Sequence, residues 1–388
     1  MRIGVLKEIK TQEHRVGLTP AGVRELCADG NEVWVEHSAG KAIGFTDADY
    51  QQAGANIAEN AAAVFARATL IIKVKEPQPA EIEQLTSEHT LFTYLPRSTL
   101  FPYTTLFRSL HLAPDRLQTA ALQHSGATCI AYETVTDNQG GLPLLAPMSE
   151  VAGRMAIQAG SQALLIHEGG LGILPAGVPG VAPANIVIIG GGVVGVNAAR
   201  MAMGIGADVT VLDNSLTKLQ QLDLQFGPRL KTLYSNAEAI DSVVQHADMV
   251  IGAVLLPGAT APKIIEYRHL EMMKTGSVLV DVSIDQGGCF ASSRPTTHDQ
   301  PTYIEQGIVH YCVANMPGAV ARTSTLALTN ATLPYIRNLA RQGGKAAFLA
   351  DRHLLNGLNI YQGKITHQAV ADAQGEAYSD PFLLMSSA

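Results

Sequence analysis

Cysteine is scarce in this chain, and tryptophan occurs only once. The four cysteines, Cys27, Cys129, Cys289 and Cys312, stand far apart, and no two of them form a C-x-x-C pair. This spacing excludes a disulfide framework and offers no ligand set for structural zinc. We therefore expect reduced core thiols in an intracellular, cytoplasmic protein.

The chain also lacks a long apolar run and a basic patch. Residues 157–174 come closest to a membrane span, but they include His167, Glu168 and several glycines. The first ten residues, MRIGVLKEIK, carry charge too early for a signal peptide. The formal net charge is −7, which argues against a nucleic-acid partner. No His, Cys or Asp cluster has metal-ligand spacing, so we expect no metal.

The 388 residues, 47% hydrophobic and 16% charged, are enough for two core-rich globular domains. Apolar runs alternate with helical stretches, which favours an α/β fold with largely parallel sheets. The predicted strands are 2–6, 31–37, 69–75, 90–95, 127–132, 186–189, 209–212, 249–254, 277–283 and 309–315. The predicted helices are 20–29, capped by Thr19, then 47–66 with a break near Gly54, a short one to about 86, 114–124, 149–168 and 322–341. We expect the tail beyond 341 to be helical and then polar, and to return to the first domain.

One stretch, residues 185–213, carries the most specific local pattern. An apolar run, 186–189, leads into Gly190, Gly192 and Gly195, which fit G-x-G-x-x-G, and a small-residue helix follows. The first glycine makes the turn, the second admits a pyrophosphate, and the third lets helix and strand pack closely. A second apolar run then ends in Asp213, about 20 residues on, where a carboxylate binds the ribose hydroxyls of NAD.

The pattern therefore predicts a dinucleotide site, and NAD is the expected cofactor. A carboxylate at Asp213 would repel the 2′-phosphate of NADP. No arginine follows it directly, and Lys218 is the nearest cation. The alternative is a doubly wound domain with a tight turn and no nucleotide.

Polar side chains at predicted strand ends are the candidates for chemistry. Arg15 follows the first strand, and a guanidinium fork suits a substrate carboxylate, although a solvated surface arginine has the same spacing. Lys73 and Lys75 alternate with apolar residues before Pro77 ends their strand. Either lysine is a candidate to point into a crevice between the domains.

Asp281 and Asp285 flank another strand end, where a carboxylate can accept a proton or orient a base. A turn or N-cap role is the alternative, because two glycines follow. His111 begins the sequence HLAPD. A lone histidine is more often structural, but a dehydrogenase acting at a C–N or C–O bond needs a proton acceptor near neutral pH.

Long strings of the sequence resemble the alanine dehydrogenase family over nearly all of residues 1–370. They include MRIGVLKEIK, EHRVGLTP, IIKVKEP, PLLAPMSEVAGRMA, VDVSIDQGGC and YCVANMPGAVARTST. The resemblance implies two doubly wound, Rossmann-like domains with a cleft between them, and a homohexamer. It places the substrate domain at 1–144 with 317–388, and the NAD-binding domain at 145–316.

The resemblance also implies site residues. The family's substrate-binding residues fall on Arg15 and Lys75. Its acid/base pair falls on His111 and Asp285. The positions lining the NAD site fall on Ser149, Asp213 and Lys218, and the loop by the nicotinamide falls on Asn315 and Met316.

The implied reaction is reversible oxidative deamination of L-alanine to pyruvate and ammonia, with a hydride passing to NAD. Three other readings stay open. They are the NAD-binding component of a proton-translocating transhydrogenase, a saccharopine-dehydrogenase-like enzyme for a larger amino acid, and a non-catalytic NAD-binding protein.

Residues 96–110, PRSTLFPYTTLFRSL, depart from the family pattern, in which LFTYL runs directly into HLAPD. The segment nearly repeats itself, has two arginines and no acid, and differs from its surroundings. It reads as translated adaptor sequence, with a surface loop or an active-site lid as alternatives. We expect low order there and impaired turnover, because His111 would be positioned by a long flexible connection and not by the end of a strand.

Overall fold

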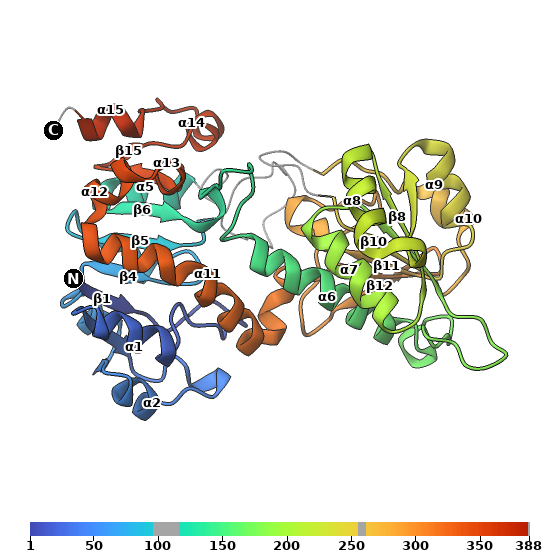
Figure 1. The fold of residues 1–388 in the computed structure, drawn as a ribbon, viewed down its shortest axis with the longest axis horizontal. Helices are drawn as coiled ribbons and strands as arrows, with labels where there is room; N and C mark the ends of the chain where they lie inside the picture. The colour runs from blue at the N-terminus through green and yellow to red at the C-terminus, as the bar shows by residue number, and fades with distance from the viewer. Residues whose placement is uncertain (96–115, 255–260, 387–388) are drawn as a thin grey trace. The chain divides into compact units, whose positions relative to one another are not determined.

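The computed structural model describes residues 1–95, 116–254 and 261–386. The chain divides into two compact units, each described by itself below. Unit 1 comprises Met1–Met148 and Val320–Ala388, and unit 2 comprises Ser149–Ala319. Each unit has one mixed, mostly parallel sheet with helices packed on it, so the predicted α/β class with two doubly wound domains is confirmed (Figure 1).

The sheet of unit 1 has the order β15-β14-β6-β5-β4-β1-β2-β3. The six strands from β6 to β3 are parallel, whereas β14 runs antiparallel to β6, and β15 runs antiparallel to β14. Its strands are β1 (Arg2–Val5), β2 (Glu32–Glu36), β3 (Asn56–Ala58), β4 (Leu70–Ile72), β5 (Thr90–Thr93), β6 (Thr128–Ala131), β14 (Leu358–Tyr361) and β15 (Lys364–Ile365).

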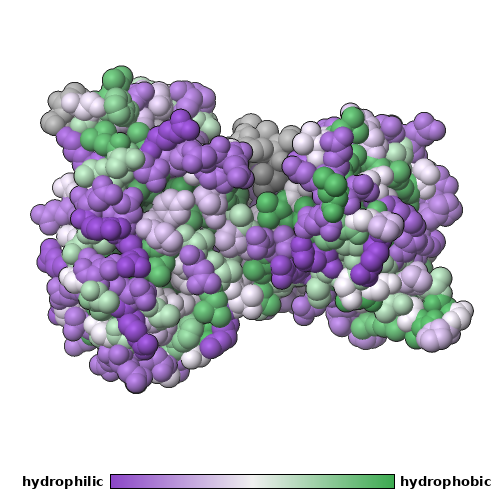
Figure 2. Space-filling view, in the orientation of Figure 1, coloured by the Kyte–Doolittle hydropathy of each residue, from purple (hydrophilic) through white to green (hydrophobic). Residues whose placement is uncertain are grey.

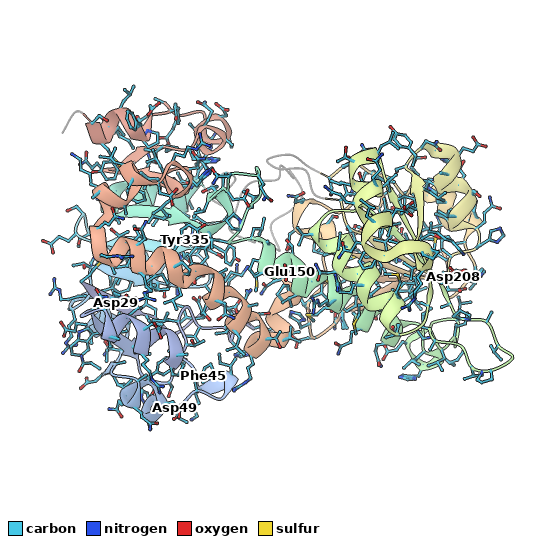
Figure 3. All side chains as sticks on the ribbon, viewed as in Figure 1. Asp29, Phe45, Asp49, Glu150, Asp208 and Tyr335 are labelled. Atoms are coloured by element: carbon cyan, nitrogen blue, oxygen red, sulfur yellow. The ribbon has the colours of Figure 1, made fainter. Side chains whose placement is uncertain are left out.

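The helices of unit 1 pack on this sheet and on one another. They are α1 (Pro20–Ala28), α2 (Asp47–Gln52), α3 (Ala61–Phe65), α4 (Pro79–Ile82), α5 (Arg116–Ser125), α11 (Ala321–Gln342), α12 (Gly344–Ala350), α13 (Arg352–Leu355), α14 (Gln368–Gln374) and α15 (Pro381–Ser386). Thr19 caps α1 as predicted, because its hydroxyl accepts from the Gly22 N–H at 3.2 Å. Arg337 of α11 donates to Asp29, at the end of α1 (Figure 3), and joins the two helices at an Nε–Oδ2 distance of 2.6 Å.

Two predictions for unit 1 are wrong. The tail beyond 341 is not helical throughout its described residues, because β14 and β15 add two strands to the sheet edge beside β6. The alanine-rich stretch 47–66 is not a broken helix, since β3 separates α2 from α3. Ile57 of β3 pairs with Val35 of β2 in a parallel register and extends the sheet by one strand. Pairing with a neighbouring strand overrides the helix preference of the surrounding alanines, a tertiary effect that local propensity does not contain.

The sheet of unit 2 has the order β12-β13-β11-β10-β7-β8-β9, in which only β12 is antiparallel to its neighbour. Its strands are β7 (Asn185–Ile189), β8 (Asp208–Asp213), β9 (Lys231–Tyr234), β10 (Met249–Gly252), β11 (Val278–Asp281), β12 (Thr302–Glu305) and β13 (Ile308–Tyr311). Its helices are α7 (Val193–Gly204), α8 (Leu216–Phe226), α9 (Ala237–Val244), α10 (Tyr267–Met272) and α6 (Ala146–Ala163), whose first turn begins in unit 1. The helix predicted for 149–168 thus begins and ends earlier.

Both sheets have the doubly wound order. Counted along the chain, the parallel strands of each unit run 3-2-1-4-5-6, and the order reverses between β1 and β4 in unit 1 and between β7 and β10 in unit 2. Ligands of such sheets bind at the carboxyl ends of the strands beside that reversal. This rule directs attention to the residues that follow β1, β4 and β7.

The interior of each unit is apolar. Buried side chains such as Leu91 and Ile360 form the core of unit 1, and Ile188 and Val280 belong to that of unit 2. Hydrophilic residues dominate the visible surface of each unit, with apolar ones scattered between them (Figure 2). Among the residues that the structure describes, no helix is long and apolar enough to cross a membrane.

Candidate active site

The glycine-rich turn of unit 2 lies at the carboxyl end of β7, beside the reversal of strand order. Gly190 has a φ of +105°, and a Cβ there would lie 2.5 Å from the carbonyl oxygen of Ala253, the residue after β10. A Cβ on Gly195 would lie 1.8 Å from the carbonyl oxygen of Gly190. Only glycine therefore fits at these two positions, which bring α7 tightly against the turn.

Gly192 has the opposite surroundings. No atom of the described residues lies within 4 Å of a Cβ built there, so the backbone is open to an approaching group. Gly192 is also the N-cap of α7, where it supplies no side-chain acceptor for the first-turn N–H groups. An accessible helix N-terminus behind a glycine turn suits a phosphate-bearing ligand.

Asp213 is the last residue of β8, and its carboxylate contacts the glycine-rich turn. Its Oδ2 accepts from the Gly191 N–H at 2.7 Å, and its Oδ1 accepts from the Ser215 N–H at 2.8 Å. Lys218 lies on α8, with its Nζ 3.6 Å from Asp213 Oδ2. Each carboxylate oxygen can accept a second hydrogen bond, so the pair of oxygens remains suitable for ribose hydroxyls.

The other residues predicted to line this site occupy different elements. Ser149 is half-buried in the first turn of α6. Asn315 follows β13 with a φ of +60°, a left-handed conformation that asparagine tolerates. Its carbonyl oxygen accepts from the Gly318 N–H at 2.9 Å and faces His298 Nε2 at 3.3 Å. Met316 is buried at the start of a 3₁₀ turn, Met316–Val320.

In unit 1, Arg15 is buried in the segment between β1 and α1, so it is not a solvated surface arginine. Its Nε donates to Glu13 Oε1 at 2.7 Å, and its Nη2 donates to Glu13 Oε2 at 2.5 Å. Burial opposes ionisation of both groups, yet the guanidinium lowers the pKa of Glu13 to about 2, and the carboxylate raises the pKa of Arg15. The pair is therefore held charged, and Arg15 is fixed in orientation.

Lys75 follows β4, and its backbone carbonyl accepts from the Thr93 hydroxyl at 2.8 Å. Burial lowers the pKa of the Lys75 amine, and the nearby Arg15 guanidinium lowers it further. The structure thus brings Arg15 and Lys75 together at the strand ends where the order of the unit 1 sheet reverses. Two cationic side chains that are close enough to interact electrostatically can together bind a small anion.

The two aspartates at the end of β11 differ in their surroundings. Asp281 is fully buried, and its Oδ2 accepts from the Cys289 N–H at 2.9 Å and from the Ser293 hydroxyl at 2.5 Å. It therefore has the turn role that was the alternative. Asp285 is exposed in the 3₁₀ turn Val282–Gln286. His111 and the segment 96–110 lie outside the described residues, so the structure reports nothing on either.

Sequence reasoning missed Glu13, the buried anion that orients Arg15. Its position two residues before the arginine was the available signal, although nothing local indicates that both side chains become buried. It also missed the partners of Lys73, which ion-pairs with Glu8 and Glu81. Glu8 lies in the segment after β1, and Glu81 lies on α4.

Known proteins resemble this chain over nearly its whole length. The N-terminal domain of the alanine dehydrogenase/PNT family matches residues 4–152, and the C-terminal domain matches residues 156–368. An alanine dehydrogenase of Halomonas elongata is 56% identical over 378 residues, covering 97% of this chain and 98% of that protein. One of Mycobacterium tuberculosis is 49% identical over 381 residues, covering 98% and 99%.

Solved structures agree. An L-alanine dehydrogenase has a TM-score of 0.90 and 48% identity, covering 96% of this chain and 99% of the other. A transhydrogenase from Sinorhizobium meliloti has a TM-score of 0.78 at 22% identity, a likeness of fold alone. By both domain matches and by these relatives, the chain belongs to the alanine dehydrogenase/PNT family.

Proposed function

We propose that this protein is an NAD-dependent dehydrogenase that converts L-alanine reversibly to pyruvate and ammonia. The observation that carries the proposal is the set of relatives named alanine dehydrogenase, which are about half identical across nearly the full chain. The adjacent cations Arg15 and Lys75 supply independent chemical support. They suit a small substrate with one carboxylate and one carbonyl.

Unit 2 is the proposed NAD-binding unit. The open backbone at Gly192, the tight glycines at 190 and 195 and the carboxylate of Asp213 fit a pyrophosphate followed by a ribose with free hydroxyls. Bound NAD would supply the hydride acceptor. We assign Lys218, Ser149, Asn315 and Met316 to the lining of the same site on the family pattern.

Unit 1 is the proposed substrate unit. Arg15 presents the Nη1/Nη2 edge of its guanidinium to the alanine carboxylate, while Glu13 holds the Nε/Nη2 edge and keeps the group from rotating. The Lys75 ammonium donates to the carbonyl oxygen of pyruvate, and its lowered pKa makes it a readier proton donor than an ordinary lysine. Asp285 and His111 are the proposed proton carriers while water adds and ammonia leaves.

Incubation of the protein with L-alanine and NAD, followed by NADH absorbance, tests the activity directly. We expect turnover with L-alanine and, in reverse, oxidation of NADH with pyruvate and ammonium. Binding of NADH without turnover would instead support a non-catalytic NAD-binding protein. Hydride transfer to an NADP-binding partner without any use of alanine would support a transhydrogenase component.

Arg15→Lys tests the substrate site, because it keeps the charge and removes the planar fork. We expect kcat/KM for pyruvate to fall about 10- to 100-fold while the KM for NADH stays within about twofold. Arg67→Met is the matched control, since Arg67 is exposed in the same unit and stacks on Trp34. Equal behaviour of the two variants would remove Arg15 from the site.

On the family pattern we further propose a cytoplasmic homohexamer. Light scattering on the purified protein measures the assembly, and a monomer at working concentration would contradict that part of the proposal.

A further inference from the structure

Lys73 is a completely buried ammonium that the proposed reaction does not use. Its side chain is 0% exposed, and its Nζ lies 2.7 Å from Glu81 Oε1 and 3.3 Å from Glu8 Oε2. Both carboxylates are buried as well. A third one, Glu36, lies close enough to interact electrostatically with Lys73, while its own oxygen accepts from the Lys7 N–H at 2.8 Å.

Glu8 and Glu81, the ion-pair partners of Lys73, also accept hydrogen bonds from the backbone around Lys75. Glu8 Oε1 accepts from the Val74 N–H at 2.7 Å and from the Lys75 N–H at 3.3 Å. On the far side of Lys75, Glu81 Oε2 accepts from the Gln78 N–H at 2.7 Å. Each carboxylate thus uses one oxygen for Lys73 and the other for the backbone of residues 74–78.

Neighbouring strands fix the remaining backbone groups of this segment. The Tyr132 hydroxyl donates to the carbonyl oxygen of Lys73 at 3.0 Å, and the Val74 carbonyl accepts from the Tyr94 N–H at 3.2 Å. The Lys73 N–H donates to the Phe92 carbonyl at 3.2 Å. The backbone leading to Lys75 is therefore fixed by neutral hydrogen bonds to residues 92, 94 and 132 and by the carboxylates of Glu8 and Glu81. Only the carboxylate contacts depend on the charge of Lys73.

That charge holds the two buried carboxylates on either side of the Lys73 ammonium. Burial disfavours the ammonium of Lys73, but Glu8 and Glu81 raise its pKa above the ordinary value. Burial raises the pKa of Glu8, and the Lys73 ammonium opposes this shift. Without Lys73, two buried carboxylates would face each other, and protonation or rotation of Glu8 would release the Val74 and Lys75 amides.

We propose that Lys73 is a positioning residue of the substrate site. Its ammonium joins Glu8 to Glu81, and through them it fixes the backbone that places the Lys75 ammonium beside Arg15. The inference rests on the proposed function in one respect only, namely that Lys75 contacts the substrate. A displacement of Lys75 by about 1 Å is enough to lower the rate roughly 100-fold.

Lys73→Met tests the proposal, with Leu354→Ala as a control that removes buried side-chain atoms from the same unit far along the chain. For Lys73→Met we expect the KM for pyruvate to rise at least about 10-fold while the KM for NADH stays within about twofold. Lys73→Arg should recover part of the loss, because it keeps the charge. Leu354→Ala should lower the thermal midpoint and leave both KM values within about twofold.

A second readout needs no activity. Competitive acetylation, resolved by peptide mass spectrometry, reports the reactivity of the Lys75 amine, which depends on its pKa and burial. We expect Lys73→Met to change the Lys75 rate at least about threefold and Leu354→Ala to leave it unchanged. If Lys73→Met does not fold, Glu81→Gln breaks one arm of the bridge and should shift both readouts in the same direction by less.

The outcomes separate the two ideas. A wild-type protein without alanine turnover contradicts the proposed function, and the acetylation rates then decide the role of Lys73 alone. Unchanged Lys75 reactivity, or kinetics of Lys73→Met that match those of Leu354→Ala, would show that Lys73 only stabilises the fold and would overturn the inference.

Discussion

The buried pair of Glu13 and Arg15 gives the sharpest prediction about stability. Glu13→Gln keeps the shape of the side chain and removes its charge, which leaves the Arg15 guanidinium buried without its anion. The pKa of Glu13 is lowered from 4.5 to about 2, and at about 1.36 kcal/mol per pH unit this corresponds to about 3 kcal/mol. Removing one partner of a buried ion pair typically costs about 3–5 kcal/mol, which is consistent. The Glu13 side chain is 1% exposed, so solvent screens little of this.

The direction of the pH dependence follows from the lowered pKa. Between pH 4.5 and about 2, the unfolded chain binds a proton at Glu13 and the folded chain does not. The stabilisation is therefore complete above pH 4.5 and is lost as the pH falls towards 2. Glutamine does not titrate, so the difference in unfolding free energy between wild type and Glu13→Gln should be largest at neutral pH and shrink in acid.

Urea unfolding followed by fluorescence is the assay. Trp34 is the only tryptophan of the chain and lies in β2, next to β1, so its signal reports on unit 1. Glu25→Gln is the matched control, because Glu25 pairs with Arg337 at 3.3 Å but is 54% exposed, and it should lose less than about 1 kcal/mol. A loss below about 1 kcal/mol for Glu13→Gln, or a difference that does not shrink in acid, would refute the reasoning.

Three further changes have definite expected outcomes. Gly195→Ala should lower the thermal midpoint measured by circular dichroism, because the new Cβ would lie 1.8 Å from the Gly190 carbonyl oxygen. Gly204→Ala is the control in the same helix, since a Cβ there would have no described atom within 4 Å. It should stabilise α7 by up to about 1 kcal/mol. Asp213→Ala should weaken NADH binding about 10-fold, measured by calorimetry, because the ribose loses its acceptor. NADPH binding should weaken less, because the intact carboxylate repels the 2′-phosphate and its removal ends that repulsion. Equal losses for the two nucleotides would contradict the assignment. Deletion of residues 96–110 should raise kcat, because it restores the family spacing before the proposed catalytic histidine, and an unchanged or lower kcat would contradict that expectation.

The parts of the molecule that the sequence predicts well are those whose contacts are local. The turn from Gly190 to Gly195 and the acid at Asp213 lie within one strand–helix–strand unit, so their spacing alone defines their geometry. The cap at Thr19 is local in the same way. The α/β class likewise follows from the alternation of apolar runs and helical stretches.

Contacts between distant parts of the chain could not be predicted in this way. Glu8 accepts from the Val74 N–H across 66 positions of sequence, and no pattern near either residue encodes that pairing. The edge strand β3 was missed for the same reason, since its partner β2 lies on the other side of a helix. The burial of Glu13 and Arg15 depends on packing that local spacing does not determine.

The pairing of β14 with β6 has a consequence for how the protein is made. Ile360, Ile365 and Val370 share one apolar cluster with Leu91 and Cys129, so the core of unit 1 combines residues from the N-terminal and C-terminal parts of the chain. A ribosome completes residues 149–319 before it reaches β14, and that continuous body can fold while the earlier segment waits. The unit whose translation begins first is therefore the unit that finishes folding last, because β6 lacks its partner β14 until the end of the chain emerges.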